Sequence, residues 1–154
     1  MAIISGPGVF GVGAAEACGK EKLKLAQISS ETHTLLEKVV PPTGTSLRNP
    51  IDVGMTASLT INIYIESIKA VAADPGVDVA LIIGIGMSVE SNEKFAEAVI
   101  NIQKKSGKPF LVVEVPNIEH DFSDVFSRAG IPFFKSSERA LSTYTRVLDY
   151  YTSL

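Results

Sequence analysis

The sequence contains one cysteine and two histidines in 154 residues, and this shortage excludes several classes of protein. A lone Cys18 cannot form an intramolecular disulfide, so a reducing, cytoplasmic setting is expected. Its alanine-rich surroundings favour a small buried hydrophobe as the interpretation of Cys18. Neither histidine has a cysteine or a further histidine at metal-ligand spacing, so no metal site is predicted.

Clusters of basic residues and long apolar runs are also missing. The formal net charge is −3, and no group of Lys and Arg could neutralise a run of phosphates, which argues against nucleic acid as a partner. The longest apolar run, Val79–Ile85 with its flanks, is far shorter than the roughly 18 residues that span a bilayer. A secretory signal would require Lys or Arg near its start, and none precedes the first glycine-rich stretch. We therefore expect a soluble protein that binds neither nucleic acid nor membrane.

No arrangement of nucleophile and base stands out either. His33 lies among Glu31, Thr32, Thr34 and Glu37, which is typical of a solvated helix face. His120 precedes the start of a predicted helix, where capping or plain exposure accounts for it. The sequence has no G-x-S-x-G motif and no credible Cys–His pair. No catalytic residue is predicted in this chain.

Length and periodicity predict a single α/β domain over residues 1–154. Apolar, largely β-branched runs predict strands at Ala2–Ser5, Leu23–Ala26, Val77–Ile85, Phe110–Val115 and Ile131–Phe134. Apolar stripes and capping residues predict helices at Val9–Cys18, at Ser30–Val39, from Ser88 to Ser106, at Asp121–Ala129 and from Ser136 onward. Strands that alternate with helices indicate a parallel sheet covered by helices on both faces.

Two further segments need arbitration. Leu59–Ala73 alternates like a strand over its first half, but Ile61, Ile65 and Ile68 also recur at helical spacing. The stop signal that follows it, Asp74-Pro75-Gly76, favours a helix. Thr43–Ala57 is rich in Gly and Pro and is predicted to be an ordered loop, of a length that is often functional.

In parallel α/β sheets, ligands bind outside the carboxyl ends of the strands. The first loop there, Gly6-Pro7-Gly8-Val9-Phe10-Gly11, matches G-x-G-x-x-G, but no acidic residue stands where a dinucleotide ribose needs one. Backbone N–H groups at this helix start could contact a phosphate, or the glycines could serve only a tight turn. A second glycine-containing turn, Gly84–Ser88, would aim another helix start at the same crevice.

The sequence also resembles a known family along its whole length. The shared segments are Ile3–Val9, Ala14–Cys18, Ser29–Thr32, Pro41-Pro42, Asn49–Gly54, Asp74–Asp78, Ser106–Pro109, Ala129–Pro132 and Ser137–Ala140. They are similar to the last α-chain domain of the ADP-forming acyl-CoA (acetyl-CoA) synthetases, and to the carboxyl-terminal domain of the succinyl-CoA synthetase β subunit. The resemblance implies a flavodoxin-like, three-layer domain with a mostly parallel, five-stranded sheet, taken from a larger multidomain enzyme.

Such enzymes are acid–CoA ligases that work through an acyl phosphate and a phosphohistidine. The resemblance implies that this domain helps to hold the phosphohistidine phosphate of a neighbouring domain through helix N-termini. The residues that it assigns to phosphate binding are Gly6, Gly8, Val9, Gly84, Gly86, Met87 and Ser88, with Asn49, Asp52 and Gly54 in a structural loop nearby. CoA, ATP/ADP and Mg²⁺ are expected on other domains: the CoA-binding, phosphohistidine and ATP-grasp domains are the implied partners, and a homo-oligomer is possible.

Two departures from the family pattern keep alternatives open. The first loop lacks the extra Asn/Ser-Gly that usually precedes Gly-Pro-Gly, and Gly86-Met87-Ser88 replaces a Gly-Gly turn. A divergent, non-catalytic module that docks a protein partner, as in FdrA-like proteins, is therefore one alternative. An independent nucleotide- or CoA-binding domain is another. In none of these cases is the chain alone expected to turn over.

Overall fold

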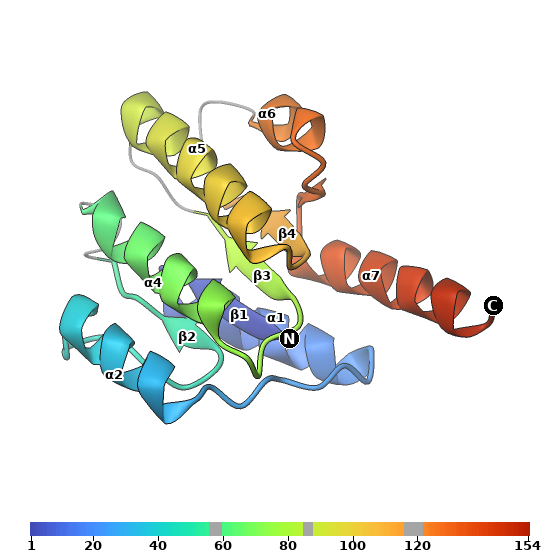
Figure 1. Cartoon of the computed structure of the whole chain (residues 1–154), viewed down its shortest axis with the longest axis horizontal. Helices are drawn as coiled ribbons and strands as arrows, with labels where there is room; N and C mark the ends of the chain where they lie inside the picture. Colours follow the sequence, from blue (N-terminus) through green and yellow to red (C-terminus); the bar gives the residue numbers. More distant parts are fainter. Residues whose placement is uncertain (56–59, 85–87, 116–121) are drawn as a thin grey trace.

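The computed structural model describes residues 1–55, 60–84, 88–115 and 122–154, and they form a parallel sheet between two layers of helices (Figure 1). The five strands run in the order β2-β1-β3-β4-β5, and every neighbouring pair is parallel. Their bounds are β1 Ala2–Ser5, β2 Ile51–Asp52, β3 Ala80–Ile83, β4 Phe110–Val113 and β5 Phe133–Phe134. This is the flavodoxin-like order of a doubly wound sheet, which confirms the predicted fold class.

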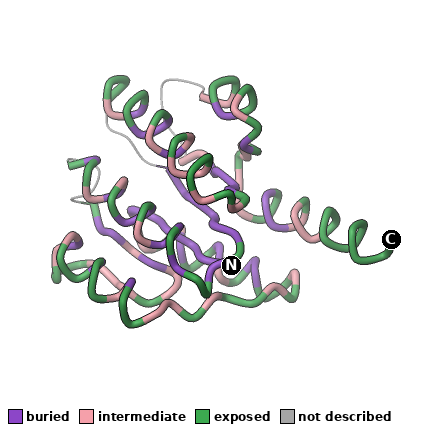
Figure 2. The backbone as a smooth tube through the Cα atoms, in the orientation of Figure 1, coloured by how far each residue is buried: buried purple, intermediate pink, exposed green. Residues whose placement is uncertain are grey.

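The helices divide between the two faces of the sheet. One face carries α1 (Gly8–Lys20) and α7 (Ser137–Thr152). The other carries α2 (Ser30–Val39), α4 (Ile61–Ala73), α5 (Val89–Ser106) and α6 (Ser123–Arg128). Alternation along the strands builds a separate core on each side: Ile3 and Leu81 face α1 and α7, whereas Ile4 and Ile82 face the other helices. The three central strands β1, β3 and β4 are accordingly buried along their length (Figure 2).

Several helix boundaries lie where the sequence predicts them. The hydroxyl oxygens of Ser29, Ser88 and Ser136 accept hydrogen bonds from backbone N–H groups in the first turns of α2, α5 and α7. Helix α5 ends at Gly107, whose φ of 67° is the left-handed conformation that favours glycine. The ambiguous segment is the helix α4, because Tyr64 and other residues at helical spacing enter the core together.

The predicted second strand was wrong. Leu23–Ala26 is not a strand. Ala26 N donates a hydrogen bond to Met1 O, and the amino group of Met1 donates one to Lys24 O, but these two bonds do not continue into a strand pairing. The strand beside β1 is Ile51–Asp52, inside the segment predicted to be a loop. The amide of Asn49 causes this arrangement, since it accepts from Ile3 N at 2.9 Å and donates to Met1 O at 2.9 Å, occupying the edge of β1 that a strand would need.

Strand β1 has its predicted bounds, whereas β3, β4 and β5 are shorter than their apolar runs suggested, with β3 limited to Ala80–Ile83 and β5 to two residues. Among the residues that the structure describes, no helix has both the length and the apolar character needed to cross a membrane.

Candidate functional site

The carboxyl ends of β1 and β3 form the point at which the chain turns to opposite faces of the sheet. After β1 the chain enters α1 on one face, and after β3 it enters α5 on the other, and in doubly wound sheets a ligand-binding crevice is expected between two such helix starts. Tyr64 lies directly below. Its hydroxyl oxygen is 2.9 Å from the carbonyl oxygen of Ile4 and also contacts that of Ile83. Complete burial raises the pKa of Tyr64 well above its usual value, so the hydroxyl keeps its proton and ties the two strand ends together.

The first glycine turn packs closely against β2. Gly6 is buried, whereas Val9 is 73% exposed at the start of α1. No side chain caps this helix start, and a Cβ at Gly8 would collide with a carboxylate oxygen of Asp52. A carboxylate therefore already lies at the positive end of α1, where a bound anion would have to compete with it.

Asp52 itself is held by its loop. Its Oδ1 accepts a hydrogen bond from Gly54 N at 2.8 Å, with Gly54 at a φ of 78°. Burial raises the pKa of Asp52, and the bond from Gly54 only partly opposes this effect. Asn49 lies at the opposite edge of the sheet, where its amide also donates to Ala26 O at 3.0 Å. Of the three predicted loop residues, only Asp52 and Gly54 lie beside the crevice.

A hollow of about 290 Å³ adjoins Asp52, α1 and the exposed side chain of Arg48. The hydroxyl of Ser5 lines this hollow, and it is the buried side-chain oxygen without a hydrogen-bond partner in the described structure. A Cβ at Gly11 would lie 2.7 Å from this hydroxyl, so glycine is needed there for α1 to approach β1. The G-x-G-x-x-G spacing thus has a packing explanation at two of its three glycines.

The second glycine turn differs from the first. Gly84 is needed because a Cβ would lie 3.0 Å from the ring of Phe95. Ser88 is exposed and starts α5, its hydroxyl accepting from Ser91 N at 3.1 Å. Helix α5 is 18 residues long and points its positive end at the crevice, with Glu90 in its first turn. Gly86 and Met87 lie outside the described residues.

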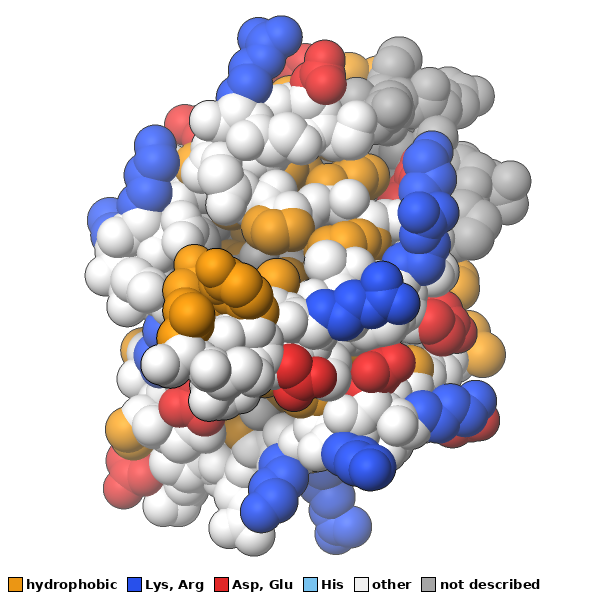
Figure 3. Space-filling view, turned by 90° about the vertical axis from the view of Figure 1, so that its right-hand side faces the viewer, with side chains coloured by type: hydrophobic (Ala, Val, Ile, Leu, Met, Phe, Trp, Pro, Cys, Tyr) orange, Lys and Arg blue, Asp and Glu red, His pale blue; other side chains and the backbone are white. Residues whose placement is uncertain are grey.

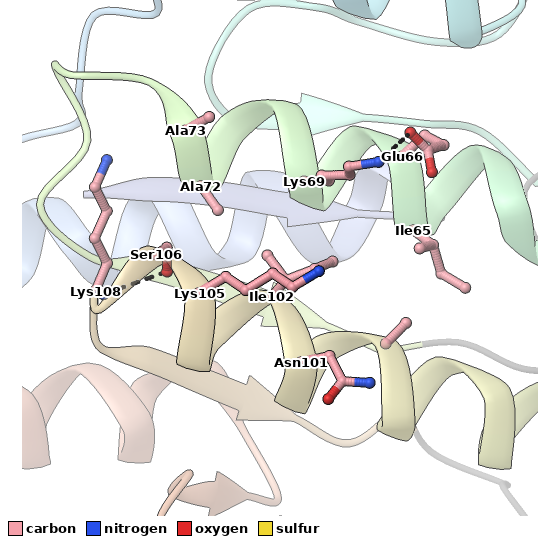
Figure 4. Close-up of a pocket in the computed structure, with 11 residues that line it drawn as sticks. Ile65, Glu66, Lys69, Ala72, Ala73, Asn101, Ile102, Lys105, Ser106 and Lys108 are labelled. Carbon is pink, nitrogen blue, oxygen red and sulfur yellow. Dashed lines mark hydrogen bonds and ion pairs between the residues drawn. The ribbon is translucent and has the colours of Figure 1, made fainter.

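Two further hollows are present, and Val9 at the start of α1 and Ile83 at the end of β3 line the smaller one. One, of about 180 Å³, separates the starts of α1 and α7 and contains the ion pair between Lys135 Nζ and Glu114 Oε2 at 3.2 Å. The other, of about 520 Å³, is a groove between α4 and α5 (Figure 4). Its apolar wall includes Ile65 and Ile102, and Lys69, Lys105 and Lys108 surround it. Of the predicted phosphate-binding residues that the structure describes, none lines this groove.

The residues of interest for metal or redox chemistry are placed as follows. His33 Nδ1 lies 3.5 Å from Glu37 Oε1 on the exposed side of α2, and His120 is not among the described residues. Cys18 is buried, and burial raises the pKa of its thiol, which makes it a poor nucleophile. Within the described ranges, no group of three or more His, Cys, Asp or Glu side chains could hold a metal ion.

Comparison with known proteins adds the missing context. No family model matches the chain. It is 29% identical over 146 residues to the α subunit of acetate–CoA ligase [ADP-forming] II of Pyrococcus furiosus, covering 90% of this chain and 31% of that protein. It is 23% identical over 152 residues to 4-hydroxybutyrate–CoA ligase [ADP-forming] of Nitrosopumilus maritimus, covering 97% of this chain and 21% of that protein.

The chain is a relative of one segment of the ADP-forming acid–CoA ligases. It spans about a fifth to a third of the length of these curated relatives. A solved acetyl-coenzyme A synthetase of Candidatus Korarchaeum cryptofilum, in complex with phosphate and ADP, has the same fold. The TM-score is 0.81 at 21% identity, over 98% of this chain and 32% of that one.

Two residues at the carboxyl ends of β1 and β3 were not identified from the sequence. Ser5 is a single polar residue at the end of a buried strand, and Tyr64 is a single hydroxyl on an apolar helical stripe. A polar group at a buried position is the signal that could have found both, because such groups must be paired with something.

Proposed function

We propose that this chain is a domain of an ADP-forming acid–CoA ligase and that it does not turn over alone. The support is that its relatives match nearly the whole chain, while the chain covers only 21% and 31% of their lengths. The hollow beside Asp52 also contains no nucleophile–base pair among the described residues, since its polar side chains are Ser5, Ser46, Arg48 and Asp52. The reacting groups, CoA and the nucleotide would then be supplied by other domains or subunits.

Within that enzyme, the start of α5 holds the phosphate of a phosphohistidine on a neighbouring domain. The observation that carries this proposal is a helix of 18 residues with an exposed start, capped by Ser88. It begins where the chain leaves β1 and β3 toward opposite faces of the sheet. Unpaired backbone N–H groups and the helix dipole stabilise a phosphate dianion without competing for a proton. Glu90 lies in the same first turn and opposes this field, but its side chain is exposed, so solvent and salt screen the repulsion.

The start of α1 has a different role in this proposal. Because the carboxylate of Asp52 lies against Gly8, that end of the crevice repels a second anion. Gly6, Gly8 and Val9 then shape the wall of the crevice and leave phosphate binding to Gly84–Ser88. The same carboxylate argues against the alternative of an independent nucleotide-binding domain. We therefore expect a calorimetric titration of this chain with ATP, NAD and CoA to be flat.

A charge placed in the first turn of α5 tests the phosphate role. Ser91→Asp adds a negative charge one turn after Ser88, and Asn101→Asp adds the same charge to an exposed position far along the helix. In the complete ligase, we expect Ser91→Asp to slow ATP formation from acyl-CoA, ADP and phosphate at least tenfold, about 1.4 kcal/mol in the barrier. Asn101→Asp should leave the rate unchanged. Equal rates for both variants and the parent would refute the assignment.

A further inference from the structure

Charged side chains of both signs stand near one another on the face of the molecule in Figure 3. An exposed charge without an ion-pair partner costs little, because water solvates it. Arg48 and Asp52 differ from such surface charges, because both line the hollow of about 290 Å³ beside the start of α1. Neither makes an ion pair in the part of the chain that the structure describes, with each other or with a third group. The hollow therefore carries one unpaired charge of each sign.

The carboxylate of Asp52 can accept further hydrogen bonds in this hollow. Its Oδ1 accepts from Gly54 N at 2.8 Å, whereas its Oδ2 lies against Gly8 and has no hydrogen-bond partner among the described residues. The side chain is only partly exposed, and burial raises its pKa because the charged form has lost part of its solvation. An ammonium group in the hollow would supply both the opposite charge and the N–H donors that this carboxylate lacks.

The hydroxyl of Ser5 is a second group of the hollow that lacks a partner. Ser5 is fully buried and lines the same hollow, and its Oγ makes no hydrogen bond within the described structure. The side chain points toward α1, since a Cβ at Gly11 would lie 2.7 Å from Ser5 Oγ but 3.8 Å from Ser5 Cβ. A buried hydroxyl without a hydrogen bond costs free energy, and native structures keep few of them. A ligand in the hollow would supply the missing partner.

The size and the walls of the hollow limit what can enter it. Gly8 and Gly11 lie three positions apart and so on one face of α1, and their lack of side chains leaves this space open. Val12 adds an apolar side chain to the same wall. Pockets for ligands generally have volumes of about 300 to 1,000 Å³. The hollow, at about 290 Å³, therefore suits a small ligand with a short apolar part.

The two unpaired charges select among small ligands. Asp52 repels a simple anion and Arg48 repels a simple cation, whereas a molecule with one charge of each sign is attracted by both. We propose that this hollow binds a small zwitterion, a free α-amino acid with a short apolar side chain. Its ammonium group lies at Asp52 and Ser5, its carboxylate at Arg48, and its side chain against Val12. This inference rests on the hollow alone and is independent of the proposed ligase function.

L-Alanine, ethylamine and propionate form a matched set of probes, because each of the last two lacks one charged group of the first. Titrations of the isotope-labelled chain, followed by NMR, should show saturable binding of L-alanine in the millimolar range and at least tenfold weaker binding of the other two. Arg48→Gln and Asp52→Asn should each weaken the binding of L-alanine at least tenfold. Asn101→Asp, an exposed charge change on α5, should leave it unchanged. Ser5→Ala should weaken binding without lowering the melting temperature of the free chain, because no hydrogen bond is lost.

Three results would overturn the proposal. The first is a parent chain whose spectrum does not respond to L-alanine far above the millimolar range. The second is equal binding of L-alanine and of either single-charge probe, which would show that the site does not recognise a zwitterion. The third is binding of L-alanine that survives both Arg48→Gln and Asp52→Asn in folded variants, which would place the ligand outside this hollow.

Discussion

Polar side chains lie at both ends of the parallel strands, but they are hydrogen-bonded to different extents at the two ends. We call these ends the amino edge and the carboxyl edge of the sheet. At the amino edge, the Asn49 amide bonds three backbone groups around β1, and the carboxylate of Asp74 accepts from Ser29 N at 2.9 Å and Gly76 N at 2.8 Å. At the carboxyl edge, the buried hydroxyl of Ser5 has no partner in the described structure, and Asp52 receives one backbone hydrogen bond. The polar side chains at the amino edge therefore make several hydrogen bonds each, whereas those at the carboxyl edge can still accept or donate more.

The two aspartates express this difference as opposite pKa shifts. Burial pushes the pKa of Asp74 upward, but hydrogen bonds from Ser29, Thr32 and Gly76 outweigh burial and bring it below its usual value. Burial also raises the pKa of Asp52, and the single bond from Gly54 does not cancel the effect. Asp74 therefore stabilises the fold in its charged form, whereas Asp52 is charged at some cost beside the crevice.

The largest expected effect is at the amino edge. Asp74→Ala removes the buried carboxylate that accepts from two backbone N–H groups and should lower the free energy of unfolding by about 3 kcal/mol at pH 7. Because the folded pKa of Asp74 is lowered, its contribution is full at neutral pH and is lost as the pH falls below about 4. Urea unfolding at pH 7 and pH 3 measures both effects. An equal loss at the two pH values would contradict the hydrogen-bonded carboxylate.

A pair of glycines in α1 tests the close packing at the carboxyl edge. Gly11→Ala places a methyl group against Ser5 and should destabilise the fold by about 1–3 kcal/mol. Gly13→Ala is the matched control. Nothing lies within 4 Å of its Cβ, so the variant should gain about 0.5–1 kcal/mol from helix propensity. Melting temperatures that move in the same direction for both would show that α1 does not contact β1 as described.

A smaller effect is expected at the second helix start. Ser88→Ala removes the hydroxyl that accepts from Ser91 N, which should cost about 1 kcal/mol. Ser88→Asn keeps an acceptor and should restore most of this loss. Chemical denaturation of the three proteins gives the comparison, and an unchanged midpoint for Ser88→Ala would mean that this cap contributes nothing in solution.

The smallest effect is on the pH dependence of stability at Asp52. Its folded pKa is raised, so ionisation weakens the fold as the pH rises from about 4. Asp52→Asn mimics the protonated side chain and should gain stability relative to the parent between pH 4 and pH 7, as measured by thermal melts across that range. A variant that loses relative stability over the same range would reverse the assignment of Asp52.

Most helices and strands could be predicted from the sequence because their ends and their burial depend on residues close together in the chain. Ser88 and Gly107 mark both ends of α5, and the apolar runs of β1, β3 and β4 mark strands covered on both faces. Strand β2 could not be found in this way. Two residues are too few to show periodicity, and Ile51 follows a proline in a segment that otherwise has the composition of a loop.

The site was predictable in outline only. The sequence placed both glycine turns at strand ends, but it could not show that Asp52 closes against Gly8, because 44 positions separate them and the contact requires β2 to pair with β1. Partnerships across that distance depend on strand order. The phosphate-binding role of Gly84–Ser88 stays a prediction, and the charge variant in α5 is the way to test it.

The hydroxyl of Tyr64 has a consequence for how the chain is made. It joins the carbonyl groups of Ile4 and Ile83, and β1 has its four-residue pairing with β3, at Ala80–Ile83. A nascent chain that has emerged from the ribosome only as far as residue 60 therefore holds β1 with only the two-residue pairing of β2. We expect such chains to remain open to proteases, and the domain to become compact only after residue 83 has left the exit tunnel.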